Sequence, residues 1–310
     1  MTEEERPVSE VINKVLQAGK AASAVDLARL SCLEKHHLQH FQQSWQGADA
    51  VHRLNLISQL VELSENDFTL DFTAIFSLSV DDLDERIRIK SVEGLGLEDK
   101  QAYVRPIIKA LQTDESEEVR SAAAGALGKF ALMAENDELP EGLSDDIFNA
   151  LLGMLENSRE PVSVRRRALE SISAFQREPV GQYIEDFYYS DDAAVKASAI
   201  YAMGRNCKTS WLNYLIDEMQ SGTAEFRYEA AQASGELEDE EAVPYLIDLV
   251  EDDDHEVQEA AIVSLGKIGG EEARQFLKNI TGRDDPRIRE AAKAALTGLT
   301  ACEDPLSLNF

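Results

Sequence analysis

The sequence is poor in cysteine and in basic side chains, and both shortages exclude functions. Its three cysteines, Cys32, Cys207 and Cys302, are too few and too scattered for a disulfide framework or a four-thiolate metal site, which favours the reducing cytoplasm. The 59 acidic residues outnumber the 30 basic ones and leave a formal net charge of -29. Such a charge repels phosphate backbones and anionic lipid surfaces. We therefore expect neither a nucleic-acid partner nor a membrane partner.

Long apolar runs are missing as well. The uncharged run over residues 72–80 is far shorter than the roughly 20 residues that a membrane helix needs. The first residues, Met-Thr-Glu-Glu-Glu-Arg-Pro, lack the basic and apolar regions of a signal peptide. We expect a soluble, unexported protein.

What the sequence does contain is a fixed register. An apolar residue, here termed the opener, is usually followed by a basic residue, by small residues at plus four and plus seven, and often by glycine at plus nine. A fixed period of 20 to 50 residues is typical of stacked repeat arrays. Openers at a spacing of 31 residues are Val164, Val195, Phe226, Val257 and Ile288.

Each repeat contains two helical stretches, because its apolar residues recur at three- and four-residue spacing without the alternation of a strand. This predicts an all-α fold, an α-solenoid of stacked antiparallel helix pairs. Three residues before the openers stand side chains that can cap the second helix: Asp84, Ser116, Asp192, Thr223, Asp254 and Asp285. The plus-nine glycines allow close helix packing, so bulky substitutions should overpack the stack: Gly96, Gly128, Gly204, Gly235 and Gly266.

The register also predicts the domain organisation. Val119 precedes Val164 by 45 residues, so about 14 residues are extra, and the polar stretch 135–146 is where we expect them. Upstream the pattern blurs. We predict a divergent N-terminal helical cap over residues 1–66, an array of about seven helix pairs over 67–299, and a flexible tail over 300–310.

On these residues the chain resembles the bacterial HEAT-like repeat family, the group named after phycobilisome lyase HEAT-like repeats, over roughly residues 67–299. The resemblance implies a curved superhelix whose second helices line the inner, concave surface. It also implies protein binding, because most members act as scaffolds. It specifies architecture better than activity.

Some HEAT-like proteins are enzymes, and the sequence lacks the features of their sites. HEAT-like deoxyhypusine hydroxylases hold two metals with several His-Glu pairs, whereas this chain has the pair His255-Glu256 alone. HEAT-like DNA glycosylases need a basic groove, which the net charge disfavours, and no bilin pocket is recognisable. We predict a non-catalytic protein-binding scaffold without a cofactor. The alternative is an accessory subunit of a lyase-like or other small-molecule-modifying enzyme.

Two clusters allow a site interpretation and a plainer one. Cys32, His36 and His40 would share one face of a helix and could begin a zinc site, but a fourth ligand is not evident and we favour a solvated face without metal. The acidic run 236–256 could attract a basic partner, but several of its acids stand where helix N-termini favour negative charge. The sequence does not decide whether this run, or the cluster of three arginines at 165–167, binds a partner.

Basic residues at plus one predict a ladder of ion pairs between adjacent repeats, broken at Gln258. We interpret the ladder as structural. Its members are Arg88, Arg120, Arg165, Lys196, Arg227 and Arg289.

The plus-two and plus-six positions of the second helices lie opposite the core and are free to carry function. Tyrosine and arginine anchor interfaces more often than other residues do. We predict a partner-binding surface centred on Arg166, Tyr201 and Tyr228, with Ile89 and Val263 at equivalent positions. The alternative interpretation is that the tyrosines only cover neighbouring aliphatic surface, and the sequence favours neither.

Overall fold

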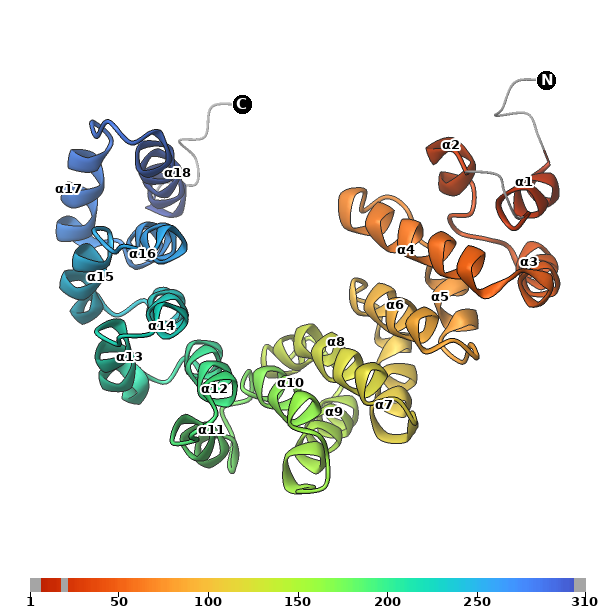
Figure 1. Ribbon diagram of the computed structural model, residues 1–310, viewed down its shortest axis with the longest axis horizontal. Helices are drawn as coiled ribbons and strands as arrows, with labels where there is room; N and C mark the ends of the chain where they lie inside the picture. The colour runs from red at the N-terminus through yellow and green to blue at the C-terminus, as the bar shows by residue number, and fades with distance from the viewer. Residues whose placement is uncertain (1–6, 18–21, 304–310) are drawn as a thin grey trace. The chain divides into compact units, whose positions relative to one another are not determined.

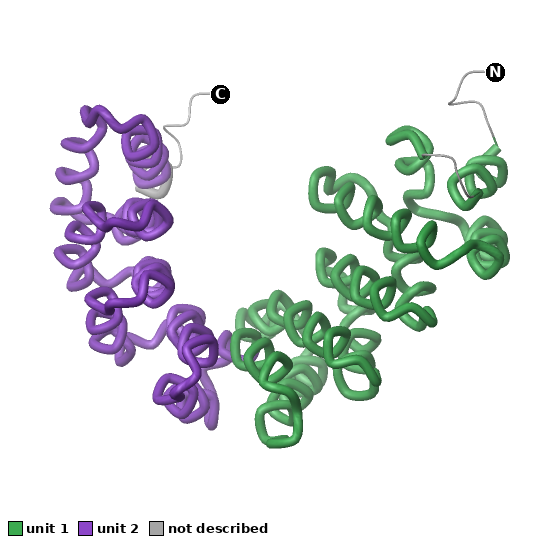
Figure 2. Tube along the Cα trace, in the orientation of Figure 1, with its two compact units in different colours: residues 1–171 green, residues 172–310 purple. Residues whose placement is uncertain are grey.

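The computed structural model describes residues 7–17 and 22–303, without the side chains of 300–303. These residues hold eighteen α-helices and, as the sequence predicts, no strand. The chain divides into two compact units, 1–171 and 172–310 (Figure 2). The tail predicted from residue 300 begins as helix, since the last helix continues to Glu303, and 304–310 lie outside the described residues.

Unit 1 contains helices α1 to α10 (Figure 1), and the last residue of α10 already belongs to unit 2. Consecutive helices from α3 onwards pair as first and second helix of a repeat. Their bounds are α1 (Val8–Val15), α2 (Ala24–Ala28), α3 (Lys35–Gly47), α4 (Ala50–Asn66), α5 (Thr73–Ser79), α6 (Glu85–Gly96), η2 (Gln101–Tyr103), α7 (Val104–Thr113), α8 (Glu117–Glu135), α9 (Glu141–Glu156) and α10 (Val162–Ile172).

Unit 2 repeats the same pairing, with the second helices α12, α14, α16 and α18 side by side in one layer and the first helices in the other (Figure 1). Its helices are α11 (Val180–Tyr188), α12 (Ala193–Asn206), η3 (Thr209–Trp211), α13 (Leu212–Met219), α14 (Ala224–Leu237), η4 (Glu240–Ala242), α15 (Val243–Leu249), α16 (His255–Ile268), α17 (Gly270–Ile280) and α18 (Pro286–Glu303).

The extra residues around 135–146 lengthen two helices instead of forming a long loop. α8 has 19 residues and α9 has 16, against 12 in α6 and 10 in α7. Only residues 136–140 lie between α8 and α9. The polar composition of this stretch is therefore that of exposed helix ends.

The register explains why the second helices start where they do. Ile87, three residues after Asp84, is the first opener of the array. Every opener from Ile87 to Ile288 is buried, with at most 9% of its surface exposed. Side chains at five of the six predicted caps accept bonds from first-turn amides; Thr223 occupies the cap position without such a bond. The accepting caps are Asp84, Ser116, Asp192, Asp254 and Asp285.

Glycine at plus nine brings neighbouring second helices into backbone contact. A Cβ built on Gly204 would lie 2.6 Å from the Cα of Ala233, and one built on Gly266 would lie 2.7 Å from the Cβ of Ala295. In each case the neighbour is the plus-seven residue of the next repeat. Gly96, Gly128 and Gly235 meet Ala126, Ser171 and Ser264 in the same way. The repeat of Val164 differs, because its plus-nine residue is the buried Ser173.

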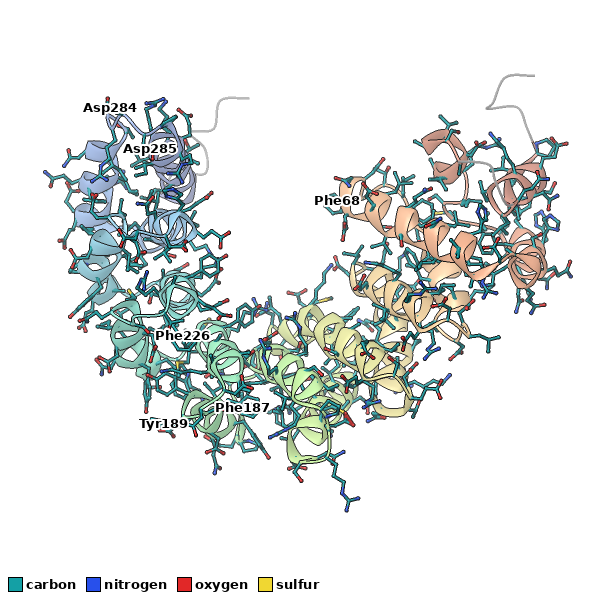
Figure 3. The ribbon with its side chains drawn as sticks, in the orientation of Figure 1. Phe68, Phe187, Tyr189, Phe226, Asp284 and Asp285 are labelled. Atoms are coloured by element: carbon teal, nitrogen blue, oxygen red, sulfur yellow. The ribbon has the colours of Figure 1, made fainter. Side chains whose placement is uncertain are left out.

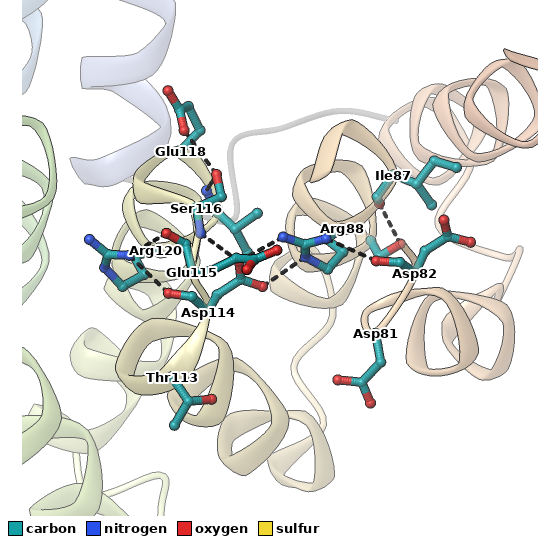
Figure 4. A network of polar contacts seen from close by, with 12 residues as sticks. Asp81, Asp82, Ile87, Arg88, Thr113, Asp114, Glu115, Ser116, Glu118 and Arg120 are labelled. Carbon is teal, nitrogen blue, oxygen red and sulfur yellow. Dashed lines mark hydrogen bonds and ion pairs between the residues drawn. The ribbon is translucent and has the colours of Figure 1, made fainter. Parts of the chain in front are cut away.

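Ion pairs join consecutive repeats on the loop side of the second helices (Figure 4). Arg88 donates from Nε and from one terminal nitrogen to the two carboxylate oxygens of Asp114, each at 2.8 Å, and from the other nitrogen to the carbonyl of Asp82 at 2.9 Å. Asp114 lies just before the next second helix, and its Oδ1 also accepts the amide of Ser116 at 2.9 Å. One guanidinium thus ties its own loop to the loop of the next repeat.

The predicted ladder is confirmed at further positions. Its cross-repeat pairs are Arg120–Glu160 at 3.1 Å, Lys196–Glu218 at 2.7 Å and Arg227–Asp252 at 2.6 Å. Gln258, the break in charge, still donates to the carbonyl of Asp252 at 2.7 Å, six residues back, as the arginines do within their own loops. The ladder also extends upstream of the predicted array, since Arg53 pairs with Asp82 at 3.2 Å.

These contacts shift the acidity of the carboxylates. Hydrogen bonds from Arg227 hold the pKa of Asp252 below its ordinary value, against the opposing effect of burial. Burial raises the pKa of Asp114, but hydrogen bonds from Arg88 and from the Ser116 amide outweigh it, so that this pKa is lowered too. Both carboxylates therefore stay ionised at neutral pH.

Gly204→Ala should destabilise the protein by about 1–3 kcal/mol, because the new methyl group meets backbone and one helix must shift. Gly125→Ala is the matched control. It lies inside α8 with nothing within 4 Å of the added Cβ, so it should stabilise by about 0.5–1 kcal/mol. Urea unfolding measures both; a Gly204→Ala protein as stable as the parent would contradict the close-contact interpretation.

Asp252→Asn should cost about 1.5–3 kcal/mol at neutral pH, because it removes the charged partner of Arg227. The folded-state pKa of Asp252 is depressed, so the contribution of the pair is complete above the unfolded-state pKa of about 4 and is lost as the pH falls through the lower folded value. The free energy of unfolding of the variant, measured by urea unfolding at a series of pH values, should accordingly fall less steeply as the pH is lowered.

The control is Glu290→Gln, which removes an exposed pair with Lys293 on α18 and should leave the free energy of unfolding nearly unchanged. If the free energy of unfolding falls as steeply with decreasing pH in Asp252→Asn as in the parent, the ladder does not contribute as described.

Candidate functional site

The plus-two and plus-six positions line a groove in unit 2. Tyr228 and Gln232 on α14 form one wall, and Glu259 and Val263 on α16 form the other. The groove has a volume of about 420 Å³. Glu256, Ala260, Ser264 and Lys267 complete its lining. On these two neighbouring helices the plus-two and plus-six positions therefore share one groove.

A second groove, of about 760 Å³, lies within unit 1 over the same register positions. Ile89 and Glu93 on α6 and Ser121 and Gly125 on α8 contribute to it. Its remaining lining combines small and apolar residues with acids: Glu65, Gly96, Leu97, Glu117, Glu118, Ala122, Ala126, Ser163 and Arg167. Both grooves thus have an apolar floor and a predominantly acidic rim.

The predicted partner-binding residues are distributed over these surfaces. Tyr228, half-buried, and Val263, 45% exposed, share the groove of unit 2. Ile89 lies in the groove of unit 1. Tyr201 is 39% exposed on α12 and Arg166 is half-buried on α10; neither lines the two grooves, and Arg167 takes part where Arg166 was expected.

Several rim residues escaped the sequence prediction because it used only two positions of each repeat. Glu256, Ala260 and Lys267 stand at minus one, plus three and plus ten from Val257. At about 100° per residue these positions project from the same side of the helix as plus two and plus six. A complete helical wheel would have found them.

Both the basic and the aromatic side chain of the groove in unit 2 have acids near them. Lys267 pairs with Glu236 at 2.5 Å. Burial raises the pKa of Tyr228, and the charges of Glu229, Glu256 and Glu259 raise it further, against a hydrogen bond with Gln232 that lowers it. The hydroxyl therefore stays protonated in a negative surrounding at neutral pH.

The acidic run 236–256 serves largely to cap and to pair. Asp239 caps η4 by accepting the amide of Glu241 at 3.0 Å, and Asp254 caps α16 by accepting the amide of Glu256 at 2.8 Å. Asp252 belongs to the ladder. These contacts match the interpretation of helix N-termini that favour negative charge.

The cluster 165–167 is drawn into local contacts. Arg167 pairs with Glu170 at 2.7 Å along α10, and Arg165 is half-buried. At least one of the three charges is therefore met by a carboxylate on the same helix.

The shared face of Cys32, His36 and His40 is not formed. α3 begins at Lys35, and Cys32 lies before it in a left-handed conformation with φ of 52°, held by a bond from its amide to the carbonyl of Asp71 at 2.8 Å. His40 contacts Asn13 at 3.0 Å. Ser31 does not cap α3 either, since its hydroxyl accepts the amide of Asp71.

A different set of possible ligands comes together at this point. Side-chain atoms of Glu34, His36 and His37 lie within 4.8 Å of one another, all on the surface at the start of α3. They are near neighbours in sequence and at least partly solvated. Such a set can contact a metal ion, but it offers no enclosed coordination shell.

The repeat register is shared with a known protein family. The family model for HEAT repeats matches residues 73–146 and 212–297. The chain belongs to the HEAT-repeat family. This confirms, at the level of the repeat, the resemblance drawn from the openers, caps and glycines. No curated protein matches the chain.

Solved structures share the fold of this HEAT-repeat chain. Yeast importin-beta aligns at 12% identity over 94% of this chain and 46% of its own, with a TM-score of 0.56. The complex of CpcE and CpcF of phycocyanin lyase from Nostoc sp. PCC7120 aligns at 14% identity over 84% of this chain and 94% of that chain, with a TM-score of 0.54. At these identities the likeness shows the α-solenoid architecture alone, and this chain spans less than half of the importin.

Among the residues that the structure describes, no helix combines the length and the apolar character that crossing a membrane requires.

Purified protein equilibrated with zinc and then desalted should retain well under one ion per chain, because Glu34, His36 and His37 form an open surface set. Elemental analysis by plasma mass spectrometry measures the ratio. A content near one zinc per chain, lost in His36→Ala, would contradict this expectation and identify a metal site at the start of α3.

Proposed function

We propose that this HEAT-repeat chain is a non-catalytic scaffold that binds a peptide or protein on the exposed face of its second helices. One observation carries the proposal: positions that the core does not use line a groove in each unit, and apolar or aromatic side chains stand among them. Packing within the array does not require an exposed Val263 or the 39% exposed Tyr201. Exposed apolar positions on a rigid repeat face are typical of binding surfaces.

The cytoplasm remains the compartment that we propose. Cys32 and Cys207 are free, exposed thiols, which persist in a reducing compartment.

A second candidate is a subunit of a lyase-like complex. It is favoured by the mutual coverage with the complex of CpcE and CpcF, 84% of this chain and 94% of that chain. Under this alternative the purified chain should carry or take up a small molecule. Native mass spectrometry separates the two functions, because a scaffold should appear at the mass of the polypeptide alone.

The scaffold proposal is tested by affinity capture from lysate of the host organism. Tyr201→Ala with Tyr228→Ala tests unit 2, and Ile89→Ala with Arg166→Ala tests unit 1. A captured partner should lose about 2 kcal/mol of binding free energy, or roughly 30-fold in affinity, with at least one pair, as interface anchors do. The melting temperature should change little, because these side chains lie outside the core.

Tyr189→Ala is the matched control for the tyrosines. Tyr189 is 67% exposed and directly follows α11 in the layer of first helices (Figure 3). It removes an aromatic ring of the same kind from the other layer, so capture should persist. Capture that survives both test pairs, or that Tyr189→Ala removes equally, would place binding elsewhere on the chain.

A further inference from the structure

The groove of unit 2 combines an aromatic ring, two carboxylates and the aliphatic side chains of Ala260 and Val263. Its walls belong to α14 and α16, which pack against each other within the unit. Tyr228 stands on one wall, and Glu256, Glu259 and Val263 stand on the other. Glu256 and Glu259 are exposed, whereas Tyr228 is half-buried and so held in place by its neighbours.

The negative charge of this groove is not compensated within the described structure. Neither Glu256 nor Glu259 makes an ion pair with a residue of ranges 7–17 and 22–303. Lys267, the basic residue of the lining, is already paired with Glu236. The formal charge of -29 on the whole chain adds to the local excess. A partner that brings positive charge therefore gains attraction without displacing an existing pair.

The chemistry of the lining selects a particular cation. An ammonium or guanidinium group is attracted to the face of a tyrosine ring, and carboxylates give it charge-assisted hydrogen bonds. The methylene stem of lysine or arginine covers apolar surface while its head stays charged, which suits Val263 and Ala260 in the same groove. A small inorganic cation would use the carboxylates and leave the ring and the floor without a partner.

We propose that the groove formed by Tyr228, Glu256, Glu259 and Val263 binds a lysine- or arginine-rich segment of a partner protein. The inference rests on the proposed scaffold function and goes beyond it by naming the class of partner. The basic side chain lies against Tyr228 between the two carboxylates, and an apolar neighbour in the segment contacts Val263. No aromatic ring of the described chain lines the groove of unit 1, so that groove lacks the cation–π contact that Tyr228 can supply.

The test uses the full chain and a fluorescein-labelled peptide that alternates lysine with leucine pairs. Fluorescence anisotropy at low and moderate salt gives the affinity. The same peptide with acetylated lysines keeps the shape and removes the charge. The variant E256Q/E259Q removes the two carboxylate charges, and E271Q/E272Q removes two exposed charges from α17 in the same unit as a matched control.

The lysine peptide should bind the parent, weaken as salt rises, and lose about three- to tenfold in affinity with E256Q/E259Q, the range expected for two partly exposed charge contacts. Tyr228→Ala should weaken it similarly, and E271Q/E272Q should not. Equal losses in the two double variants would reduce the effect to general attraction by an acidic surface and overturn the inference. Undiminished binding of the acetylated peptide, or no binding at all, would overturn it too.

The two proposals fail in different ways. If partner capture depends on Tyr201 and Tyr228 while the lysine peptide shows no preference for the parent groove, the scaffold stands and the class of partner is wrong. If capture also survives the tyrosine variants, the second-helix face of unit 2 is not the binding surface.

Discussion

The structure depends on one short-range contact, the approach of a plus-nine glycine to the plus-seven residue of the next repeat. Because Gly204 and Gly266 lack a side chain, neighbouring second helices meet nearly at backbone distance. That spacing fixes where each helix stands relative to the next. Where Gly235 meets Ser264, the plus-two and plus-six side chains of α14 and α16 line one groove. The groove therefore lies over the contact itself, and Gly96 and Ala126 likewise line the groove of unit 1.

The ion-pair ladder supplies what close packing lacks, which is a directional link between loops. Nonpolar contact is tolerant of small rotations, whereas the paired hydrogen bonds of Arg88 and Arg227 are not. Asp114 and Asp252 also hold the turn that precedes the next helix. Each loop is thereby oriented by the repeat before it. Gln258 retains the bond to its own loop and lacks the charge. The hydrogen bond within a loop can therefore be kept where the ion pair to the next loop is lost.

Much of the fold could be predicted because it repeats. Openers, caps and glycines recur at fixed distances, and a local signal seen several times outweighs a local exception such as Thr223. Predictions failed where a long-range contact decided the outcome. The amide of Cys32 is bound to the carbonyl of Asp71, far along the chain. The four-residue spacing of Cys32, His36 and His40 therefore could not reveal that α3 begins only at Lys35.

The candidate site was predicted in part for the same reason. Tyr228 and Val263 were placed by register alone, and the structure brings them into one groove. Glu256 and Lys267 on its rim were missed, because the prediction considered two positions per repeat. That Lys267 is paired with Glu236 also required coordinates, since a flexible side chain with several acids near it has no partner that spacing can specify.

The close approach at the plus-nine glycines has a thermodynamic consequence. A repeat array unfolds as a one-dimensional chain of neighbours, in which cooperativity passes from one repeat to the next through their shared interface. Part of that interface is the glycine contact between neighbouring second helices, at Gly96 and Gly128 within unit 1 and at Gly204, Gly235 and Gly266 within unit 2. A side chain added at one of these glycines therefore weakens the coupling between two repeats as well as the packing of either one.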